Sequence, residues 1–454
     1  MDRGKSTPES GRLARSRWAS CPTTFYRVRA RRAAAAGGTP ALLRTATSLL
    51  RDRLMRQWVL PIAIAAAFLS CGKPVEKHAE VAVPIGRPDN ARTRLVERFD
   101  LAWRKLESFR AQQAARQAQQ PGTEPAPPQP IQFVSGVKES FKHLDMTAIN
   151  SAPVNVPITG DQTGPSVLKA QVYLDRVHFS VGAIDGGWGK NSSIAVWQWQ
   201  RSHGMEPTGD VDQATFLSIA AAAGYVQPLV QYHVMEDDVN GHFVRIPDNV
   251  YEKQHLSCLC YQSVREELAE KFHAAEDFLK DLNRDVSFSE LRAGDTIVVP
   301  NVRPALTADQ HDIAKIVISI AGNSFDTFDA NTNLIFHAPT TVGAGYDPSP
   351  TETLHIIEIL PNPHFHYDPK LYHEVPDYMP DAHLSPGPNS PVGVVWMALS
   401  KEHYGIHGTA DPESIGYVSS HGCIRLTNWD AEEVEHRVTT GVTVAFVDTR
   451  RHRE

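Results

Sequence analysis

The sequence predicts a multidomain protein in which a mainly β C-terminal domain, a β-sandwich, follows a small all-α domain and a short α+β module. The chain has 454 residues, more than the ~250 to 300 that one hydrophobic core usually serves. Residues 164–224 carry three apolar segments at helical spacing, whereas residues 312–448 carry short apolar runs between Pro and Gly clusters. Two such different patterns require separate cores.

The first 71 residues indicate an export signal. Residues 1–54 hold twelve Lys and Arg against three Asp and Glu, and the remainder holds 33 against 49. Residues 55–71 combine a short basic start, an apolar run too short to span a bilayer, and Cys71. This ending resembles a bacterial lipoprotein signal, which would make Cys71 the lipidated N-terminus. Plain secretion and a buried helix are the alternatives. If Met55 is the true start, residues 1–54 form a doubtful leader with no fold.

Residues 91–130 predict an amphipathic helix followed by a Gln- and Pro-rich linker, because apolar residues recur at three and four before Pro becomes frequent. The helices of residues 164–224 are separated by glycine turns, and Asp210 or Asp212 can cap the third. Residues 230–303 read as a strand, two short helices and a closing apolar strand. The remaining acidic excess argues against a nucleic-acid partner.

The chemistry concentrates in Ser420-His421-Gly422-Cys423-Ile424-Arg425, with a second histidine, His407, upstream. A thiol attacks carbonyls as its thiolate and therefore needs a base. We predict Cys423 as nucleophile and His407 as general base and acid, with the second His407 nitrogen held by a backbone carbonyl or by the hydroxyl of Thr409. His421 would line the pocket or share the proton chemistry.

Backbone N–H groups of Gly422 and Cys423 are predicted to hold an oxyanion. The guanidinium of Arg425 suits a substrate carboxylate, and Tyr404, Gly408 and Ser420 are the other predicted substrate contacts.

Two alternatives compete with the thiol interpretation. His407, His421 and Cys423 could together ligate zinc, although a His-x-Cys spacing is unusual for a zinc pair. A buried cysteine among structural histidines is the plainer alternative, but a glycine follows each histidine in a loop. The pair Cys258 and Cys260 is expected to be small buried residues, with a disulfide as the second choice.

Two upstream modules resemble cell-wall binders. The motifs Ile184-Asp185-Gly186, Trp188-Gly189 and Thr208-Gly209-Asp210 resemble the peptidoglycan-binding three-helix domain. Trp188 and Trp197 could stack on sugars, or serve only the fold. Residues 230–303 resemble a LysM-type module at Leu282-Asn283 and at Gly294 to Pro300, with about thirty extra residues before the first helix.

The sequence around Cys423 resembles the L,D-transpeptidase catalytic domain of the YkuD type over about residues 314–447. His407-Gly408-Thr409, the Ser420 to Arg425 motif and Pro386 to Gly393 carry the resemblance, and Pro350-Thr351-Glu352 departs from the family's usual Pro-Thr-Gly. The family's nucleophile, paired histidine and second motif histidine map to Cys423, His407 and His421.

The resemblance implies a mechanism and a location. The thiol of Cys423 would attack a peptidoglycan tetrapeptide stem, release D-Ala, form a thioester and pass the acyl group to an amine. It implies no metal or organic cofactor, peptidoglycan as partner, and a role in cell-wall organisation and cell shape. Together with the signal-like segment ending at Cys71, it predicts a periplasmic, membrane-anchored lipoprotein. Alternatives are an L,D-carboxypeptidase, with water as acceptor, and an inactive wall-binding lipoprotein.

Overall fold

The computed structural model describes residues 130–142 and 145–448. The predicted leader 1–54, the signal 55–71 with Cys71, and all but the last residue of segment 91–130 lie outside these ranges. All described residues belong to one of the two compact units of the chain. Within them, no helix combines the length and apolar character that crossing a bilayer requires.

The helical module consists of α3 (Pro165–Arg176), α4 (Lys190–Ser202) and α5 (Gln213–Ala222). Proline begins α3, where its missing N–H costs nothing, and the Asp212 side chain caps α5 by accepting from the Thr215 N–H. Two short parallel strands and a helix, which the sequence did not reveal, precede the module: β1 (Phe133–Val134), α2 (Met146–Ser151) and β2 (Val154–Asn155).

The second module pairs β3 (Leu229–His233) with β4 (Thr296–Pro300) as antiparallel strands. Between them, α8 (Val264–Lys271) and α9 (Glu276–Leu282) pack onto the strands through one apolar cluster. The long insertion holds α6 (Glu236–Val239) and α7 (Val250–Lys253), and η1 (Phe288–Glu290) precedes β4.

Cys258 and Cys260 form a disulfide in that insertion. The preferred expectation of two small buried thiols was therefore wrong, and the second choice holds. Two cysteines separated by one residue can form a disulfide where the backbone turns, and the sequence spacing alone does not reveal such a turn.

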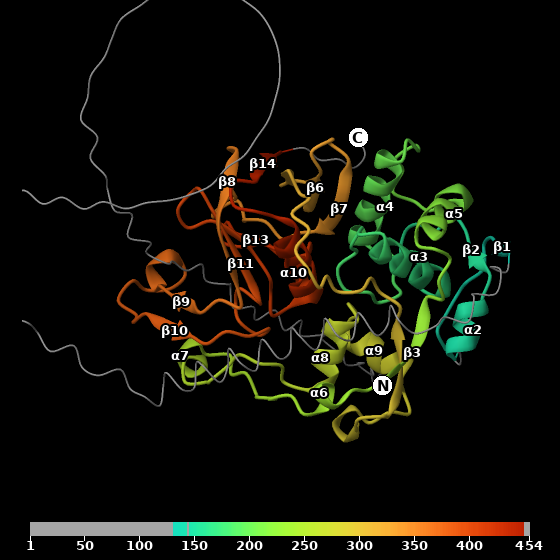
Figure 1. Cartoon of the computed structure of the whole chain (residues 1–454), viewed down its shortest axis with the longest axis horizontal. Helices are drawn as coiled ribbons and strands as arrows, with labels where there is room; N and C mark the ends of the chain where they lie inside the picture. The colour runs from blue at the N-terminus through green and yellow to red at the C-terminus, as the bar shows by residue number, and fades with distance from the viewer. Residues whose placement is uncertain (1–129, 143–144, 449–454) are drawn as a thin grey trace, which may run out of the picture. The chain divides into compact units, whose positions relative to one another are not determined.

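The C-terminal domain is one eight-stranded mixed sheet in the order β13-β12-β11-β8-β14-β5-β6-β7 (Figure 1). Its strands are β5 (Lys315–Ser319), β6 (Ser324–Phe328), β7 (Leu334–Pro339), β8 (Leu354–Pro361), β11 (Val395–Leu399), β12 (Gly405–His407), β13 (Ile424–Arg425) and β14 (Thr443–Val447).

This sheet curls so that its outer strands approach each other. A bridge joins Thr341, just past the end of β7, to Arg425 of β13. Side chains from both halves of the sheet share one core, which includes Phe325, Met397 and Ile424. The predicted sandwich is thus a single sheet folded over its own core, and α10 (Asn428–Arg437) packs against that core through Ala431 and Val434.

An excursion from the sheet carries the hairpin β9 (Phe365–Tyr367) and β10 (Ala382–Leu384), with η2 (Pro369–Leu371) between the strands. The hairpin has its own small core, which it shares with Leu259 of the second module. A further single turn, η3 (Pro412–Ser414), lies in the loop between His407 and Cys423.

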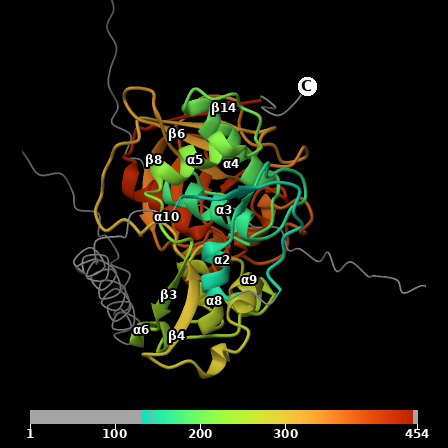
Figure 2. The same ribbon diagram turned by 90° about the vertical axis from the view of Figure 1, so that its right-hand side faces the viewer.

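Arg303 joins the helical module to the sheet domain. Its guanidinium is 4 % exposed and contacts Asp175 of α3 together with Asp430 and Glu433 of α10. His273, at the end of α8, also contacts Asp175 and stacks on Trp429. Removing one member of such a buried cluster would leave uncompensated charge. The helices α3, α8 and α10, which this cluster connects, are labelled in Figure 2.

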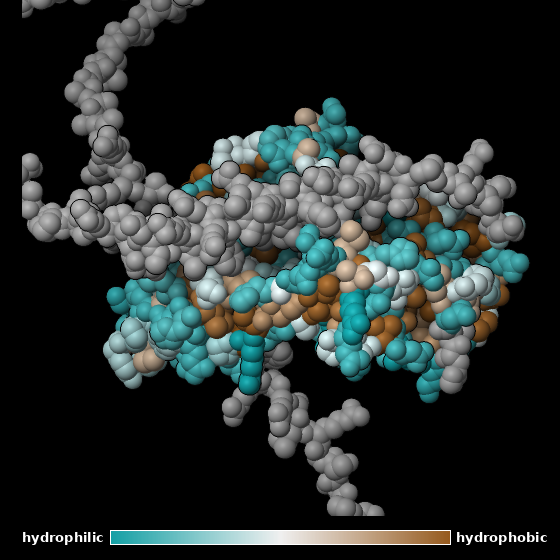
Figure 3. All heavy atoms as spheres, turned by 60° about the horizontal axis from the view of Figure 1, so that its bottom comes forward, coloured by the Kyte–Doolittle hydropathy of each residue, from teal (hydrophilic) through white to brown (hydrophobic). Residues whose placement is uncertain are grey.

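On the face shown in Figure 3, apolar residues are interspersed with polar ones. Exposed aromatic side chains nevertheless occur on loops of the sheet domain, at Tyr346, Tyr378 and Tyr417. Tyrosine suits ligand contact because it offers an apolar ring and a polar tip. Tyr346 lies near His421, two residues before Cys423, with ring centroids 6.4 Å apart.

Candidate active site

Two adjacent strands bring His407 and Cys423 to the same face of the sheet. β12 and β13 are parallel neighbours, with Ile406 opposite Ile424 and His407 opposite Arg425. Side chains alternate along a strand, so Cys423, two residues before Arg425, shares the side of Arg425 and His407. Ile406 and Ile424 occupy the other side, in the core. Residues sixteen apart in sequence therefore converge on one surface of the sheet.

His407 is buried and oriented by its own loop. The residue is 1 % exposed, and its Nδ1 lies 2.7 Å from the carbonyl oxygen of Gly408. A carbonyl oxygen only accepts, so Nδ1 carries the proton and Nε2 is left as the basic nitrogen. Of the two partners that the sequence predicted for this nitrogen, a backbone carbonyl and the Thr409 hydroxyl, the structure shows the backbone carbonyl. The ring also stacks on Trp396, with centroids 5.5 Å apart.

His407 is neutral at ordinary pH. Burial and the positive charge of Arg425 lower the pKa of His407 to about 3, against the smaller opposing effect of the Gly408 carbonyl. A buried imidazole resists charging because the cation loses its hydration. The resting site can therefore offer a neutral base to a thiol.

The loop that carries Cys423 is fixed by hydrogen bonds from Ser420. The Ser420 hydroxyl donates to the Cys423 carbonyl over 2.6 Å and accepts from the Gly422 N–H over 3.2 Å. Gly422 adopts φ +105°, which favours glycine. The Cys423 thiol is buried and donates to the His403 carbonyl, with a sulfur to oxygen distance of 3.8 Å.

These contacts give structural roles to three predicted residues. Ser420 is 2 % exposed and its hydroxyl is used inside the loop, so it shapes the loop. The Gly422 N–H, predicted as an oxyanion donor, already donates to Ser420. Gly408 is also structural, because a Cβ there would lie 2.2 Å from Asn428 Oδ1 and leave no room for a ligand.

Arg425 lies beside His407 as a buried cation. It is 9 % exposed, and its Nε has no hydrogen-bond partner within the described part of the chain. A buried guanidinium with an unpartnered Nε is suited to an incoming carboxylate. Tyr404 packs against Gly422 and donates its hydroxyl to the Pro348 carbonyl over 3.3 Å.

Asn428, which sequence reasoning missed, holds the His407 loop in place. Its Oδ1 accepts the Thr409 N–H over 3.1 Å, and its Nδ2 donates over 2.7 Å to Glu270 of α8 in the second module. Burial raises the pKa of Glu270 to about 8. The only sequence signal was an amide at the start of a helix, which is too common to identify a support for the base.

His421 points toward a different set of residues from those predicted. Its Nε2 lies 3.0 Å from Glu374 Oε1 and 3.8 Å from Asp347 Oδ2. In residues 130–142 and 145–448, a geometry able to hold a metal ion groups His421 with Asp347 and His373, and does not include His407 or Cys423. The zinc arrangement of His407, His421 and Cys423 is therefore unsupported.

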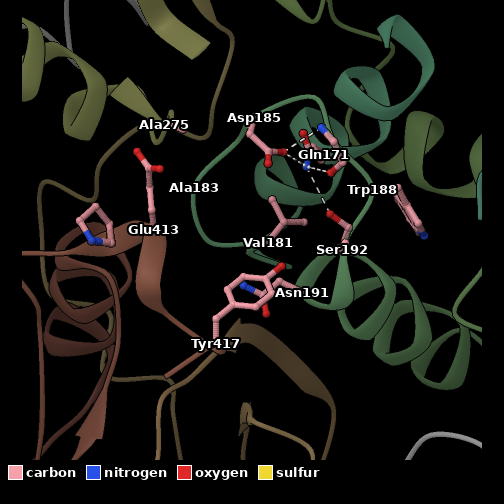
Figure 4. Close-up of a pocket in the computed structure, with 13 residues that line it drawn as sticks. Gln171, Val181, Ala183, Asp185, Trp188, Asn191, Ser192, Ala275, Glu413 and Tyr417 are labelled. Atoms are coloured by element: carbon pink, nitrogen blue, oxygen red, sulfur yellow. Dashed lines mark hydrogen bonds between the residues drawn. The ribbon is translucent and has the colours of Figure 1, made fainter. Parts of the chain in front are cut away.

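A pocket of about 320 Å³ lies between the helical module and the loop from His407 to Cys423 (Figure 4). Figure 4 shows Glu413 and Tyr417 of this loop facing Asp185 of the helical module across the pocket. Asn191 of α4 docks the two parts by donating to the Ile415 carbonyl over 2.9 Å. Polar side chains and the aromatic residues Trp188 and Tyr417 line the pocket together.

A buried thiol and a neutral, oriented histidine on adjacent strands define a cysteine-dependent acyl-transferring enzyme. Residues 314–447 match the L,D-transpeptidase catalytic domain family, YkuD, and residues 163–218 match the peptidoglycan-binding domain family. The L,D-transpeptidase homologue YkuD of Bacillus subtilis (strain 168) is 32% identical over 156 residues, which are 34% of this chain and 77% of that protein. The chain therefore belongs to the L,D-transpeptidase family.

Further similarities have lower identity. The YkuD homologue of Bacillus licheniformis is 28% identical over 181 residues, covering 40% of this chain and 92% of that protein. The crystal structure of L,D-transpeptidase 3 from Mycobacterium tuberculosis is 18% identical and covers 35% of this chain and 77% of that chain, with a TM-score of 0.25. The L,D-transpeptidase structure from Xylanimonas cellulosilytica is 14% identical over 65% and 98% of the two chains, with a TM-score of 0.30.

Proposed function

We propose that this L,D-transpeptidase cleaves the bond before the terminal D-Ala of a peptidoglycan tetrapeptide stem and passes the acyl group to an amine. The observation that carries the proposal is the pairing of Cys423 with the neutral, oriented His407 on neighbouring strands. The family match and the peptidoglycan-binding match point to the same substrate.

In the first half-reaction, Nε2 of His407 takes the thiol proton as the sulfur of Cys423 attacks the carbonyl carbon. The resulting oxyanion needs backbone donors, for which the Cys423 N–H is the proposed group. The tetrahedral intermediate then collapses, the bond to the D-Ala nitrogen breaks, and His407 returns the proton to that nitrogen. A thioester on Cys423 and free D-Ala result.

In the second half-reaction, an amine attacks the thioester carbonyl and His407 accepts the proton from its nitrogen. The carbon–sulfur bond breaks, the new amide leaves, and the thiol is restored by the proton held on His407. Water in place of the amine would give a carboxypeptidase. Arg425, buried beside His407 with an unpartnered Nε, is the proposed contact for a stem carboxylate.

We assign glycan binding to the pocket between the helical module and the His407 to Cys423 loop. Its lining combines hydrogen-bonding side chains with aromatic rings, a mixture that suits the hydroxyls and apolar faces of sugars, and it has no Lys or Arg. Tyr417→Ala is expected to weaken binding to insoluble peptidoglycan, and Tyr378→Ala, an exposed tyrosine outside the pocket, is the control. Equal binding of Tyr417→Ala and wild type would contradict this assignment.

The β3-α8-α9-β4 order of the second module supports a LysM-like assignment, as does Asn283 bracing β4 from the end of α9 through the Val298 backbone. The proposed location is the periplasm, with a lipid anchor at Cys71, on the basis of the signal-like sequence alone. Intact mass of the mature protein would test both the anchor and the start at Met55.

The function is tested by incubating the protein with a diaminopimelate-type tetrapeptide. Mass spectrometry should detect a covalent adduct on Cys423 and release of D-Ala, and Cys423→Ala should abolish both. No adduct and no D-Ala release by the wild type would favour a wall-binding protein, and D-Ala release that is unchanged in Cys423→Ala would exclude Cys423 as nucleophile. Product analysis with an added amine separates transfer from hydrolysis.

A further inference from the structure

We propose that Asp347, His373 and His421 form a binding site for a divalent transition-metal ion such as Zn²⁺, with Glu374 as a fourth donor. The three residues present one ligand atom each, and these atoms lie within 4.8 Å of one another. Imidazole nitrogen and carboxylate oxygen are the donors that Zn²⁺ accepts in proteins. This site is separate from the pair formed by His407 and Cys423.

The spacing of the donor atoms fits a small tetrahedral ion. Ligands about 2.0 to 2.1 Å from such an ion lie about 3.3 Å from one another. His373 Nδ1 lies 3.2 Å from Asp347 Oδ2 and 3.1 Å from Glu374 Oε2. His421 Nε2 lies 3.0 Å from Glu374 Oε1 and 3.8 Å from Asp347 Oδ2. Asp347, His373 and His421 thus lie close enough to share one ion, and Glu374 lies beside both histidines as a further donor.

One oxygen in this cluster makes no well-aligned hydrogen bond. Asp347 Oδ2 is shielded from solvent, and in the described ranges it has only ion-pair distances of 3.2 Å to His373 Nδ1 and 3.8 Å to His421 Nε2. A buried carboxylate oxygen normally finds a donor, because leaving it unpaired costs free energy. A cation between Asp347 and the two imidazoles would satisfy it.

The rings that flank the cluster hold His421 in place. The His421 side chain is only 5 % exposed, and Tyr372 packs edge-on against it with centroids 5.4 Å apart. Tyr346 packs edge-on against His373, with centroids 4.8 Å apart. Ligands with restricted rotamers lose less freedom on binding, so the site is partly preorganised.

The proposed ion would join three separate segments. Asp347 belongs to the loop after β7, His373 and Glu374 to the segment between η2 and β10, and His421 to the loop that carries Cys423. Binding would therefore tie the β9–β10 excursion to the catalytic loop. The ion would also occupy the nitrogen of His421 that faces the carboxylates, removing it from proton exchange.

The test measures Zn²⁺ binding in Cys423→Ala, which separates the site from the thiol. Calorimetry of the full chain should give one Zn²⁺ bound per chain in this background. Adding His373→Ala or Asp347→Asn should weaken binding at least about tenfold, the loss usual even for residues that only support a ligand. His366→Ala is the matched control, because His366 lies in the same excursion and pairs with Asp381, outside the cluster.

Three outcomes would overturn the proposal. Binding that disappears in Cys423→Ala but persists in His373→Ala would place the metal at the thiol. Unchanged affinity in both His373→Ala and Asp347→Asn would exclude the cluster. Co²⁺ provides an independent measurement, since a four-coordinate nitrogen and oxygen site should give d–d absorption without a sulfur charge-transfer band in the Cys423→Ala protein. Absence of that absorption would also contradict the proposal. None of these readouts depends on transpeptidase activity.

Discussion

The ionisation of His407 gives the sharpest test of the proposed mechanism. Burial and Arg425 lower the pKa of His407 to about 3, so the base should stay neutral well below pH 6. The experiment is a pH titration of the wild type and of Arg425→Met. Methionine keeps a long side chain but removes the charge. Arg425→Met should raise the pKa of His407 by removing the electrostatic repulsion, while burial still keeps it below its usual value.

The difference between the two possible pKa values is large enough to measure. At pH 5.5, a histidine with a pKa of about 6.5 would be only about 9 % neutral, whereas one with a pKa of about 3 would be more than about 99 % neutral. If protonation of His407 controls the acid side of the pH profile, kcat/KM should therefore keep most of its plateau value at pH 5.5. A base with the ordinary histidine pKa would lower kcat/KM about tenfold at that pH.

The same shift affects stability. Since the folded pKa lies below the unfolded value near 6.5, the unfolded chain binds more protons between these two pH values. Stability is therefore lost as the pH falls below about 6.5 and continues to fall until about 3. At pH 4.5 the loss relative to neutral pH is about 3 kcal/mol.

Two assays check this reasoning. Ring NMR of labelled histidine, assigned by comparison with His407→Gln, gives the pKa of His407 directly. The rate of D-Ala release, measured as a function of pH, gives the pH at which kcat/KM begins to fall. A resonance of His407 that titrates near pH 6.5 would refute the account of a neutral buried base. If kcat/KM falls with a pKa near 6.5 while the His407 resonance does not titrate in that range, the fall in kcat/KM belongs to another group.

Three further predictions follow from neighbouring contacts. Gly408→Ala should lower kcat by about 10²-fold, because the added Cβ would press on Asn428 Oδ1 and displace the carbonyl that orients His407. The control is Gly345→Ala, which has open space around it and should leave kcat unchanged. Arg303→Met should destabilise the fold by about 3 to 5 kcal/mol in denaturant unfolding, since three carboxylates lose their buried partner, and a loss below about 1 kcal/mol would contradict this. Glu270→Gln should raise Tm more at pH 8.5 than at pH 5. The pKa of Glu270 in the folded protein is about 8, above its value in the unfolded chain, so the stability of the wild type falls as the pH rises toward 8. An equal change in Tm at both pH values would refute this prediction.

Local patterns in the sequence were sufficient to predict most individual elements of the sheet domain. Apolar runs at Ile313 to Ile320 and Val392 to Leu399 correspond to β5 and β11, because alternation and β-branched residues report burial on a sheet. β6 was missed, since Ser324 and Asp326 interrupt its apolar character. Both are buried and accept or donate within a polar cluster that includes Gln198 of α4. Only tertiary contacts make such a strand stable.

The sequence singled out the proposed reactive pair, Cys423 and His407, but not the residues that position them. Cys423 and His407 stand out because a thiol and an imidazole each sit next to glycine in a loop. Asn428 and Glu270 could not be found in this way, because their importance depends on distances between modules. The same holds for Asp347, which reaches His421 from seventy-four residues upstream. Pairing across modules leaves no periodic signal in the sequence.

Both upstream modules therefore contribute to the active site, and the helical module also matches the peptidoglycan-binding domain family. Glu270 of α8 accepts from Asn428, Asn428 holds the Thr409 N–H, and the adjacent Gly408 carbonyl orients His407. On the opposite side, Asn191 and Lys190 of α4 donate to the Ile415 and Gly416 carbonyls in the loop that leads to Cys423. The second module thus supports the His407 end of the segment between base and nucleophile, and the helical module supports the middle of that segment. The sheet domain alone would lose both supports, so we expect its isolated form to retain Cys423 and His407 but to position them less well.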